Sequence, residues 1–176
     1  MQVGLFHTGA PRHDADGVVS RINALGRLVR QAGGIVIFIQ HHGPQGDTFE
    51  PGKDGWKLLE SLEQKDGDIV VSKQTCDAFY KTELARILQD HDARELIVTG
   101  CATDFCVDTT VRAAASRDYE IIVVEDGHTT ADRPHMDALS VIRHHNWVWE
   151  NLIHPERPIR VVPAARVAAE IESRMS

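Results

Sequence analysis

The chain has 176 residues, of which 42% are hydrophobic and 26% charged. This composition fits one globular domain over residues 1–176 and excludes disordered, collagen-like and coiled-coil proteins. The formal net charge is −7, which argues against a nucleic-acid partner. No apolar run is long enough to cross a bilayer, and no basic stretch followed by an apolar one opens the sequence, so we expect a cytoplasmic protein with no membrane partner.

Helices and strands are predicted to alternate along the chain. The predicted elements are a helix over 16–32, strands over 35–39 and 69–71, a helix over 84–88, a strand over 96–98, a helix over 107–114, a strand over 121–124, a helix over 136–142, a strand over 159–162 and a helix over 164–174. The strand segments are rich in β-branched residues and do not alternate with polar ones, which is typical of strands covered on both faces. The order predicts an α/β fold, a Rossmann-like three-layer sandwich with a mainly parallel sheet between helices.

Ligands of such folds bind beyond the carboxyl ends of the strands, so the loops that follow the strands are the candidate site. These loops contain His41 and His42, Lys73, the segment Gly100–Cys106, and the segment Asp126–Asp132. The polar stretch 41–55 is predicted to be one long loop that could cover a pocket.

Cys106 is the strongest candidate for a chemical role. It follows a buried strand and a short turn, and it is expected in the first turn of a helix. Free backbone N–H groups and the helix dipole favour a thiolate there and supply donors for an oxyanion. The alternative is that Cys106 is a small buried side chain that packs the helix on the sheet. Cys76 and Cys101 are assigned to packing, and no disulfide framework is expected from three cysteines.

Lys73 follows the buried run 69–71 after one intervening residue, Ser72. Its ammonium group would emerge at the same sheet edge as Cys106, where a cation stabilises a thiolate. The alternative is a solvated charge at the end of a strand. Lys73 is a candidate site residue because it is expected to lie close to Cys106.

Two short motifs carry a resemblance to a known family. They are Lys73-x-x-x-Asp77-Ala78-Phe79 and Gly100-x-Ala102-Thr103-x-x-Cys106-Val107. Together they resemble the paired signature of the isochorismatase-like cysteine hydrolases, a superfamily that also contains nicotinamidases, and the resemblance spans almost the whole chain. It implies that Cys106 is a nucleophile that attacks an amide-like carbonyl and that Lys73 steadies the charges.

The resemblance carries further expectations. It implies a cis peptide bond between Cys101 and Ala102, and an oxyanion hole formed by the N–H groups of Ala102 and Cys106. It also implies a small-molecule substrate, no organic cofactor, and a homo-oligomer.

The sequence departs from the family at the third member of its catalytic triad, an aspartate that takes the thiol proton. That aspartate ends the family's first strand, in a run of the form apolar-apolar-Asp-x-Gln, and the sequence given begins at Met1-Gln2. We expect that the natural protein carries this strand and its aspartate, because the strand lies in the middle of the family's sheet. Without it, two strands would have unpaired backbone groups on either side of a gap. Asp14 and Asp16 fit a helix-capping role better than that of the base.

No metal is expected. Nicotinamidases hold a metal through an Asp-x-His element and a further histidine, and the corresponding Gln40-His41-His42-Gly43 lacks the aspartate. Whether His41 or His42 binds a metal is left open.

Four side chains are candidates for substrate contact. The three aromatic candidates are expected to flank the pocket and to select a planar or apolar acyl group, and core or subunit-interface packing is equally open for them. The fourth lies in the loop after the strand 121–124. These residues are Trp56, Phe79, Tyr80 and Thr129.

The sequence as a whole predicts hydrolysis of a small amide or related carbon–nitrogen bond through a covalent acyl-enzyme on Cys106. Two alternatives remain. The first is a catalytically inert binding protein that keeps Lys73 and Cys106 without the aspartate. The second is a thiol sensor in which Cys106 is reversibly oxidised.

Overall fold

A computed structural model describes residues 1–7 and 10–175, and the elements alternate as predicted. In chain order they are α1 (Val3–Phe6), α2 (Ala15–Gln31), β1 (Ile37–His41), the 3-10 turn η1 (Asp54–Trp56), β2 (Ile69–Lys73), α3 (Leu84–Asp90), β3 (Glu95–Cys101), the π-helical turn η2 (Thr103–Val107), α4 (Asp108–Ala115), β4 (Glu120–Thr129), α5 (Ala138–Glu150), β5 (Arg160–Val162) and α6 (Ala164–Met175). All the strand pairings are parallel, so the predicted α/β class is confirmed.

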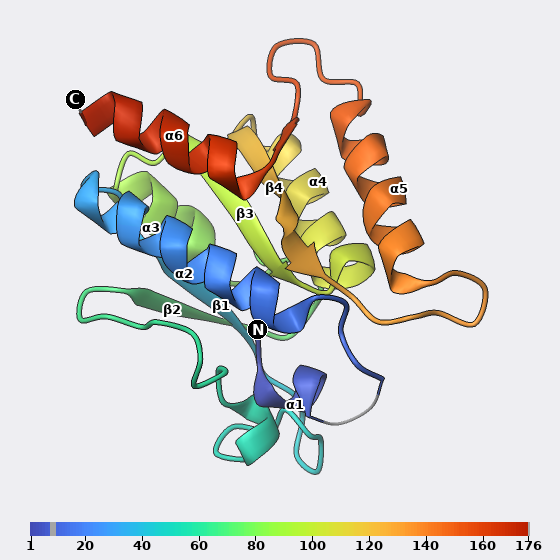
Figure 1. The fold of residues 1–176 in the computed structure, drawn as a ribbon. Coiled ribbons are helices and arrows are strands. Elements are labelled where there is room, and N and C mark those ends of the chain that lie inside the picture. Colours follow the sequence, from blue (N-terminus) through green and yellow to red (C-terminus); the bar gives the residue numbers. More distant parts are fainter. Residues whose placement is uncertain (8–9, 176) are drawn as a thin grey trace.

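Helices cover both faces of the strands (Figure 1). On one face, α2 and α6 pack on β4 and β5 through an apolar cluster that includes Leu25, Val124 and Val167. On the other, α3, α4 and α5 share a second cluster that includes Val111 and Trp149, both with no exposed surface. Burial of these apolar faces is the main source of stability, and it fixes the strand ends that carry the site.

The strands form two separate sheets, one with the order β1-β2 and the other with the order β3-β4-β5. In the described residues, β1 pairs only with β2, and β3 pairs with β4 and with no strand on its other side. Within the described residues, the facing edges of β1 and β3 therefore have no partner strand, which is the gap expected for a sheet without its middle strand.

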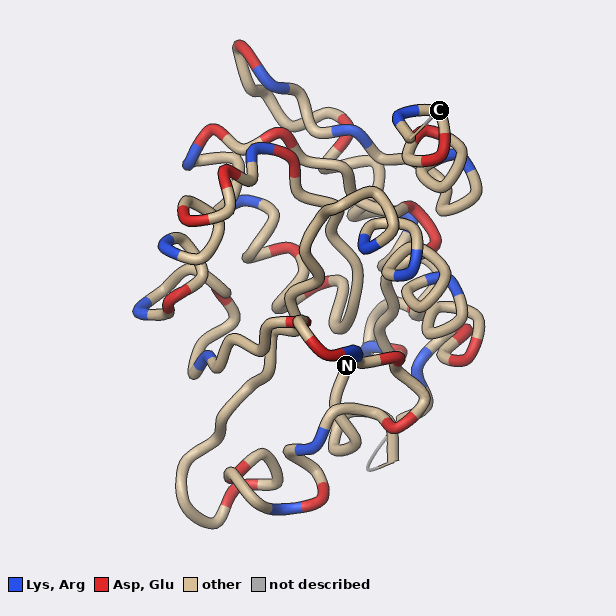
Figure 2. Tube along the Cα trace, turned by 90° about the vertical axis from the view of Figure 1, so that its left-hand side faces the viewer, with Lys and Arg blue, Asp and Glu red and all other residues tan. Residues whose placement is uncertain are grey.

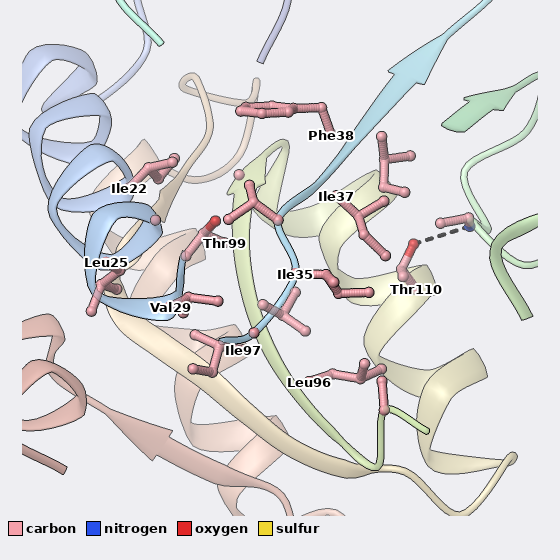
Figure 3. Close-up of a pocket in the computed structure, with 18 of the residues that line it drawn as sticks. Ile22, Leu25, Val29, Ile35, Ile37, Phe38, Leu96, Ile97, Thr99 and Thr110 are labelled. Carbon is pink, nitrogen blue, oxygen red and sulfur yellow. Dashed lines mark hydrogen bonds between the residues drawn. The ribbon is translucent and has the colours of Figure 1, made fainter. Parts of the chain in front are cut away.

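A hollow of about 900 Å³ separates β1 from β3. Figure 3 shows apolar side chains of both strands bordering this space, among them Ile37 and Ile97, with Leu25 and Val29 of α2 on one side and Thr110 of α4 on the other. We call this space the interstrand groove. Met1 lines it too, as do Lys73, Cys101 and Cys106, so the groove ends at the candidate site.

Two local expectations are wrong. One face of β2 is open, as the 49% exposure of Val70 shows. The reason is that β2 lies at the edge of its sheet, and among the described residues no helix packs over that face. Asp14 occupies the N-cap position of α2, but its backbone is left-handed and its side chain makes no capping hydrogen bond. The carboxylate instead pairs with Arg21, about two turns further along the helix.

The surface carries both signs of charge. Basic and acidic residues are interspersed along the chain in Figure 2. In the described residues, no helix is long and apolar enough to cross a membrane.

Candidate active site

Lys73 ends β2 and is 5% exposed. Its Nζ donates hydrogen bonds to the backbone oxygens of Thr75 (2.8 Å) and Cys76 (3.0 Å). Within the described part of the chain, no carboxylate lies within ion-pair distance of Lys73. A buried ammonium normally has an anionic partner. The alternative of a solvated surface charge is therefore wrong.

The chain turns sharply between β3 and Cys106. Gly100 has a φ of +130°, which favours glycine, and the peptide bond between Cys101 and Ala102 is cis. Cys106 lies in η2, where the N–H of Val107 donates to the oxygen of Ala102 five residues earlier. Cys106 thus occupies a π-helical turn before α4 rather than the first turn of an α-helix. Such turns are frequent at functional sites.

The three cysteines gather at this strand edge, and none forms a disulfide. Burial raises the pKa of Cys101 to about 11. Burial also raises the pKa of Cys76, and the charge of Cys106 and a hydrogen bond between the two thiols add to the increase, while Lys73 opposes it. Cys76 therefore lies beside Cys106, and the two side chains line the same cavity.

A cavity of about 390 Å³ opens beside Cys106. Residues that follow all four strands β1 to β4 line it, together with the segment before α2. They are Leu5, Arg12, His41, Phe49, Gln74, Thr75, Cys76, Cys101, Ala102, Phe105, Cys106 and Arg133. We call this space the Cys106 cavity. Its place beyond the carboxyl ends of parallel strands is where ligands of α/β folds bind.

Aromatic side chains form part of the wall. Phe49 comes from the long loop after β1, and Phe105 is 52% exposed next to Cys106. The guanidinium of Arg133 lies 5.1 Å from the centre of the Phe105 ring. Asp104 accepts two hydrogen bonds from Arg133, at 2.6 and 2.9 Å, so this guanidinium has a counter-charge.

The four side chains expected to contact substrate do not line the Cys106 cavity. Phe79 is 5% exposed and stacks on Tyr119 in the core, whereas Tyr80 is half exposed on the surface. Thr129 is fully buried, and its hydroxyl donates to the backbone oxygen of His13. Trp56 lies in η1, where its oxygen accepts hydrogen bonds from two glutamine side chains. These positions follow from packing partners distant in sequence.

The histidines at the end of β1, His41 and His42, show no metal geometry. The His41 ring packs edge-on against Phe49, with 5.6 Å between ring centres, and burial lowers its pKa, with the charge of Lys73 acting in the same direction. In the residues that the structure describes, no group of three histidine, cysteine or acidic side chains is placed to hold a metal ion.

Sequence reasoning missed Arg12, Phe49 and the site position of Cys76. Phe105 was missed as well, although its adjacency to Cys106 in the sequence was a signal. Nothing in the local pattern marks Arg12, because it reaches the Cys106 cavity only after the segment before α2 has packed on the loop that follows β4.

Comparison with known proteins places the chain among hydrolases. A family model described as the isochorismatase domain matches residues 1–149. The chain is 33% identical over 127 residues to a streptothricin hydrolase of Streptomyces noursei, an alignment that covers 72% of this chain and 50% of the relative. It is 40% identical over 82 residues to a ureidoacrylate amidohydrolase of Klebsiella pneumoniae subsp. pneumoniae, covering 47% and 35% of the two chains. The chain therefore spans about half the length of these curated relatives, or less.

Solved structures share the fold. An isochorismatase from Pseudomonas putida KT2440 superposes with a TM-score of 0.86 at 27% identity, over 94% of this chain and 84% of that one. A cysteine hydrolase from Pseudomonas syringae pv. phaseolicola 1448A has a TM-score of 0.89 at 23% identity, over 99% and 90%, a likeness of fold alone.

Proposed function

The chain belongs to the isochorismatase family, and from this premise we propose that it hydrolyses a small amide, or a related carbon–nitrogen bond, through a covalent intermediate on Cys106. One observation carries the proposal. The buried Lys73 at the end of β2 and Cys106 in the turn η2 after β3 line the same space. The names of the curated relatives, a streptothricin hydrolase and a ureidoacrylate amidohydrolase, support hydrolytic chemistry of this kind.

The reaction has two stages. The thiolate of Cys106 attacks the carbonyl carbon, and the tetrahedral intermediate collapses as the carbon–nitrogen bond breaks and the amine leaves with the proton first taken from the thiol. Water then attacks the thioester, releases the carboxylic acid and restores the thiol. The positive charge of Lys73 stabilises the thiolate, and the N–H groups of Ala102 and Cys106 are the proposed donors to the oxyanion.

The mechanism needs a base for the thiol proton. In the described residues Lys73 has no carboxylate partner, so a base placed there would also neutralise a buried cation. The interstrand groove runs between β1 and β3 and ends among Lys73, Cys101 and Cys106. We propose that an extended segment occupies the groove as a strand parallel to both, and that a carboxylate at its carboxyl end is the base.

A peptide experiment tests the occupant of the groove. A synthetic peptide of about seven apolar residues ending in aspartate is added to the 176-residue protein, and a second peptide ending in asparagine is the matched control. Both should slow amide hydrogen exchange in β1 and β3, because both restore strand pairing, and only the aspartate peptide should raise amide hydrolysis. Exchange in β1 and β3 that neither peptide changes would refute the strand proposal.

Ammonia release from a panel of small primary amides, measured with the aspartate peptide present to supply the base, tests the nucleophile. Cys106→Ala should abolish turnover, and Cys76→Ala is the control because it removes a neighbouring thiol of the same cavity. Both variants should fold, since each removes only a small side chain. Undiminished turnover by Cys106→Ala would exclude the covalent mechanism.

The oligomeric state of the protein is a separate proposal. We propose that the protein forms a homo-oligomer, and sedimentation of the purified chain tests this. A monomer at the working concentration would contradict it.

A further inference from the structure

Arg12 is an arginine in the Cys106 cavity without a counter-charge. Its Nε is buried and has no hydrogen-bond acceptor, while Nη1 donates to the oxygen of Ala10 at 3.2 Å. Among the described residues, no carboxylate lies within ion-pair distance of Arg12. An unsatisfied buried donor is costly, so it marks a place where an acceptor is expected.

The other arginines show that this arrangement is unusual in the protein. Most arginines of the described chain form ion pairs with acidic residues, as expected for a chain of net charge −7. Those that do not, apart from Arg12, are exposed residues. They are Arg94, Arg117 and Arg143. The guanidinium of Arg117 also donates to the oxygen of Ala113 and lies over the Phe79 ring. Arg12 is the unpaired arginine that is partly buried.

The neighbours of Arg12 do not supply the missing negative charge. Arg12 interacts with the Cys101 thiol through its charge and through a side-chain hydrogen bond, but burial raises the pKa of Cys101 to about 11, so this thiol is neutral at pH 7 and supplies no counter-charge. The carboxylate of Asp104 is already bound by both Arg133 and the Thr130 hydroxyl. The cavity therefore presents an excess of positive charge.

The backbone fixes the position of Arg12. The N–H of His13 donates to the oxygen of Thr130 at 2.9 Å, and the hydroxyl of Thr129 donates to the oxygen of His13. Both threonines are fully buried at the end of β4. The residue after Arg12 is thus anchored to the sheet, and the guanidinium is held where a ligand of the cavity would meet it.

We propose that the substrate carries a carboxylate and that Arg12 binds it side-on through Nε and the adjacent Nη2, an inference that rests on the proposed hydrolase function. Arginine recognises a carboxylate by two parallel hydrogen bonds, a geometry that lysine does not reproduce. Phe49 and Phe105 supply the apolar wall between the carboxylate and the amide. A cavity of about 390 Å³ limits the substrate to a small molecule.

A matched pair of ligands tests whether the cavity prefers a ligand that carries a carboxylate. Succinamate carries an amide and a carboxylate, whereas succinamide is a near-isosteric neutral molecule. Calorimetry should show that the wild-type protein binds succinamate about 10- to 100-fold more tightly than succinamide, the range expected for charge-assisted hydrogen bonds. Equal affinity for the two ligands, or a preference for succinamide, would overturn the inference.

Variants test the residue. Arg12→Gln should remove the preference, and Arg12→Lys should recover only part of it. Arg143→Gln removes the same charge from the exposed surface of α5 and should keep the full preference. Thermal melts report whether each variant folds. A preference that survives in a folded Arg12→Gln protein would assign the recognition elsewhere.

The binding result is independent of turnover. Succinamate that binds through Arg12 and is not hydrolysed would support the inference while counting against the proposed function. Hydrolysis of both amides at equal kcat/KM, with acylation of Cys106, would support the function and refute the inference. The two failures are therefore distinguishable.

Discussion

At the scale of single residues, His128 shows how burial fixes a protonation state. Its ring is 1% exposed, its Nε2 donates to Asn146 Oδ1, and its Nδ1 accepts from the Thr103 hydroxyl, both at 2.9 Å. Burial lowers the pKa of His128 from 6.5 to about 4. The unfolded chain binds this proton near pH 6.5, so His128 stabilises the fold above that pH, and the contribution is lost as the pH falls toward 4.

The expected loss is about 3 kcal/mol in the free energy of unfolding between pH 6.5 and pH 4, at 1.36 kcal/mol for each unit of pKa difference. Urea unfolding at several pH values measures it. His128→Gln keeps a polar side chain without the titration, so its free energy of unfolding should depend less steeply on pH. Parallel pH profiles for the two proteins would contradict the assignment.

Lys73 gives a second prediction at this scale. Lys73→Met removes the cation without leaving a buried charge, and alkylation of Cys106 near pH 7 should slow about tenfold because the thiolate loses its partner. Lys81→Met, on an exposed lysine that contacts the Tyr80 ring, is the control and should leave the rate unchanged. An unchanged rate in Lys73→Met would remove Lys73 from the site.

The sequence predicts the position of a residue when the strand pattern determines it. It does not predict the position when tertiary packing determines it. Lys73 and Cys106 follow buried apolar runs, so the sequence alone brings them to one edge. Phe79 and Thr129 also lie near strand ends, but Tyr119 and the backbone of His13 draw them into the core. Their destinations depend on contacts about 40 to 116 residues away, which a local pattern does not encode.

At the scale of elements, α5 is held to the sheet by Trp149. The side chain is fully buried, packs at 5.1 Å against the His128 ring, and its Nε1 donates to Asp108 Oδ1 at 2.8 Å. Trp149→Phe should lower the free energy of unfolding by about 2–3 kcal/mol, because a buried hydrogen bond is lost and a void is left. Trp147→Phe, at a 63% exposed position of the same helix, should change it by less than about 0.5 kcal/mol. Similar losses in the two variants would contradict this account.

Helices were predicted more securely than the turn that carries Cys106. The apolar spacing of α2, α4 and α6 is strong, and each begins and ends within a few residues of its predicted range. The turn η2 has the composition of an α-helical start, and its extra residue per turn arises from the backbone path between β3 and α4. Periodicity does not distinguish a π-helical turn from the first turn of an α-helix.

At the scale of the whole molecule, the division into two sheets is expected to make the β1-β2 sheet less stable than the β3-β4-β5 sheet. β4 has a partner on both sides, whereas β1 and β2 pair only with each other in the described residues. Amides of β1 and β2 should therefore exchange with solvent at least tenfold faster than those of β4, since a two-stranded sheet opens at a lower free energy. Peptide-resolved hydrogen exchange measures this, and simultaneous exchange of all five strands would contradict it.

The parallel α/β architecture and the position of the candidate site were predicted from the order of the elements, because crossover connections and the strand-end rule leave few alternatives. The lining of the Cys106 cavity was not predicted from the order of the elements, because segments that are distant in sequence enclose the cavity. Arg12 from before α2 and Arg133 from after β4 meet there only in the folded chain.

The central claim is that Cys106 carries the acyl group. Intact-mass spectrometry of protein quenched during turnover of a small amide, followed by peptide mapping, measures this directly. The account predicts a mass increase equal to the acyl group, located on the peptide with Cys106 and absent in Cys106→Ala. Turnover with no adduct on Cys106, or with the adduct on Cys76, would contradict it.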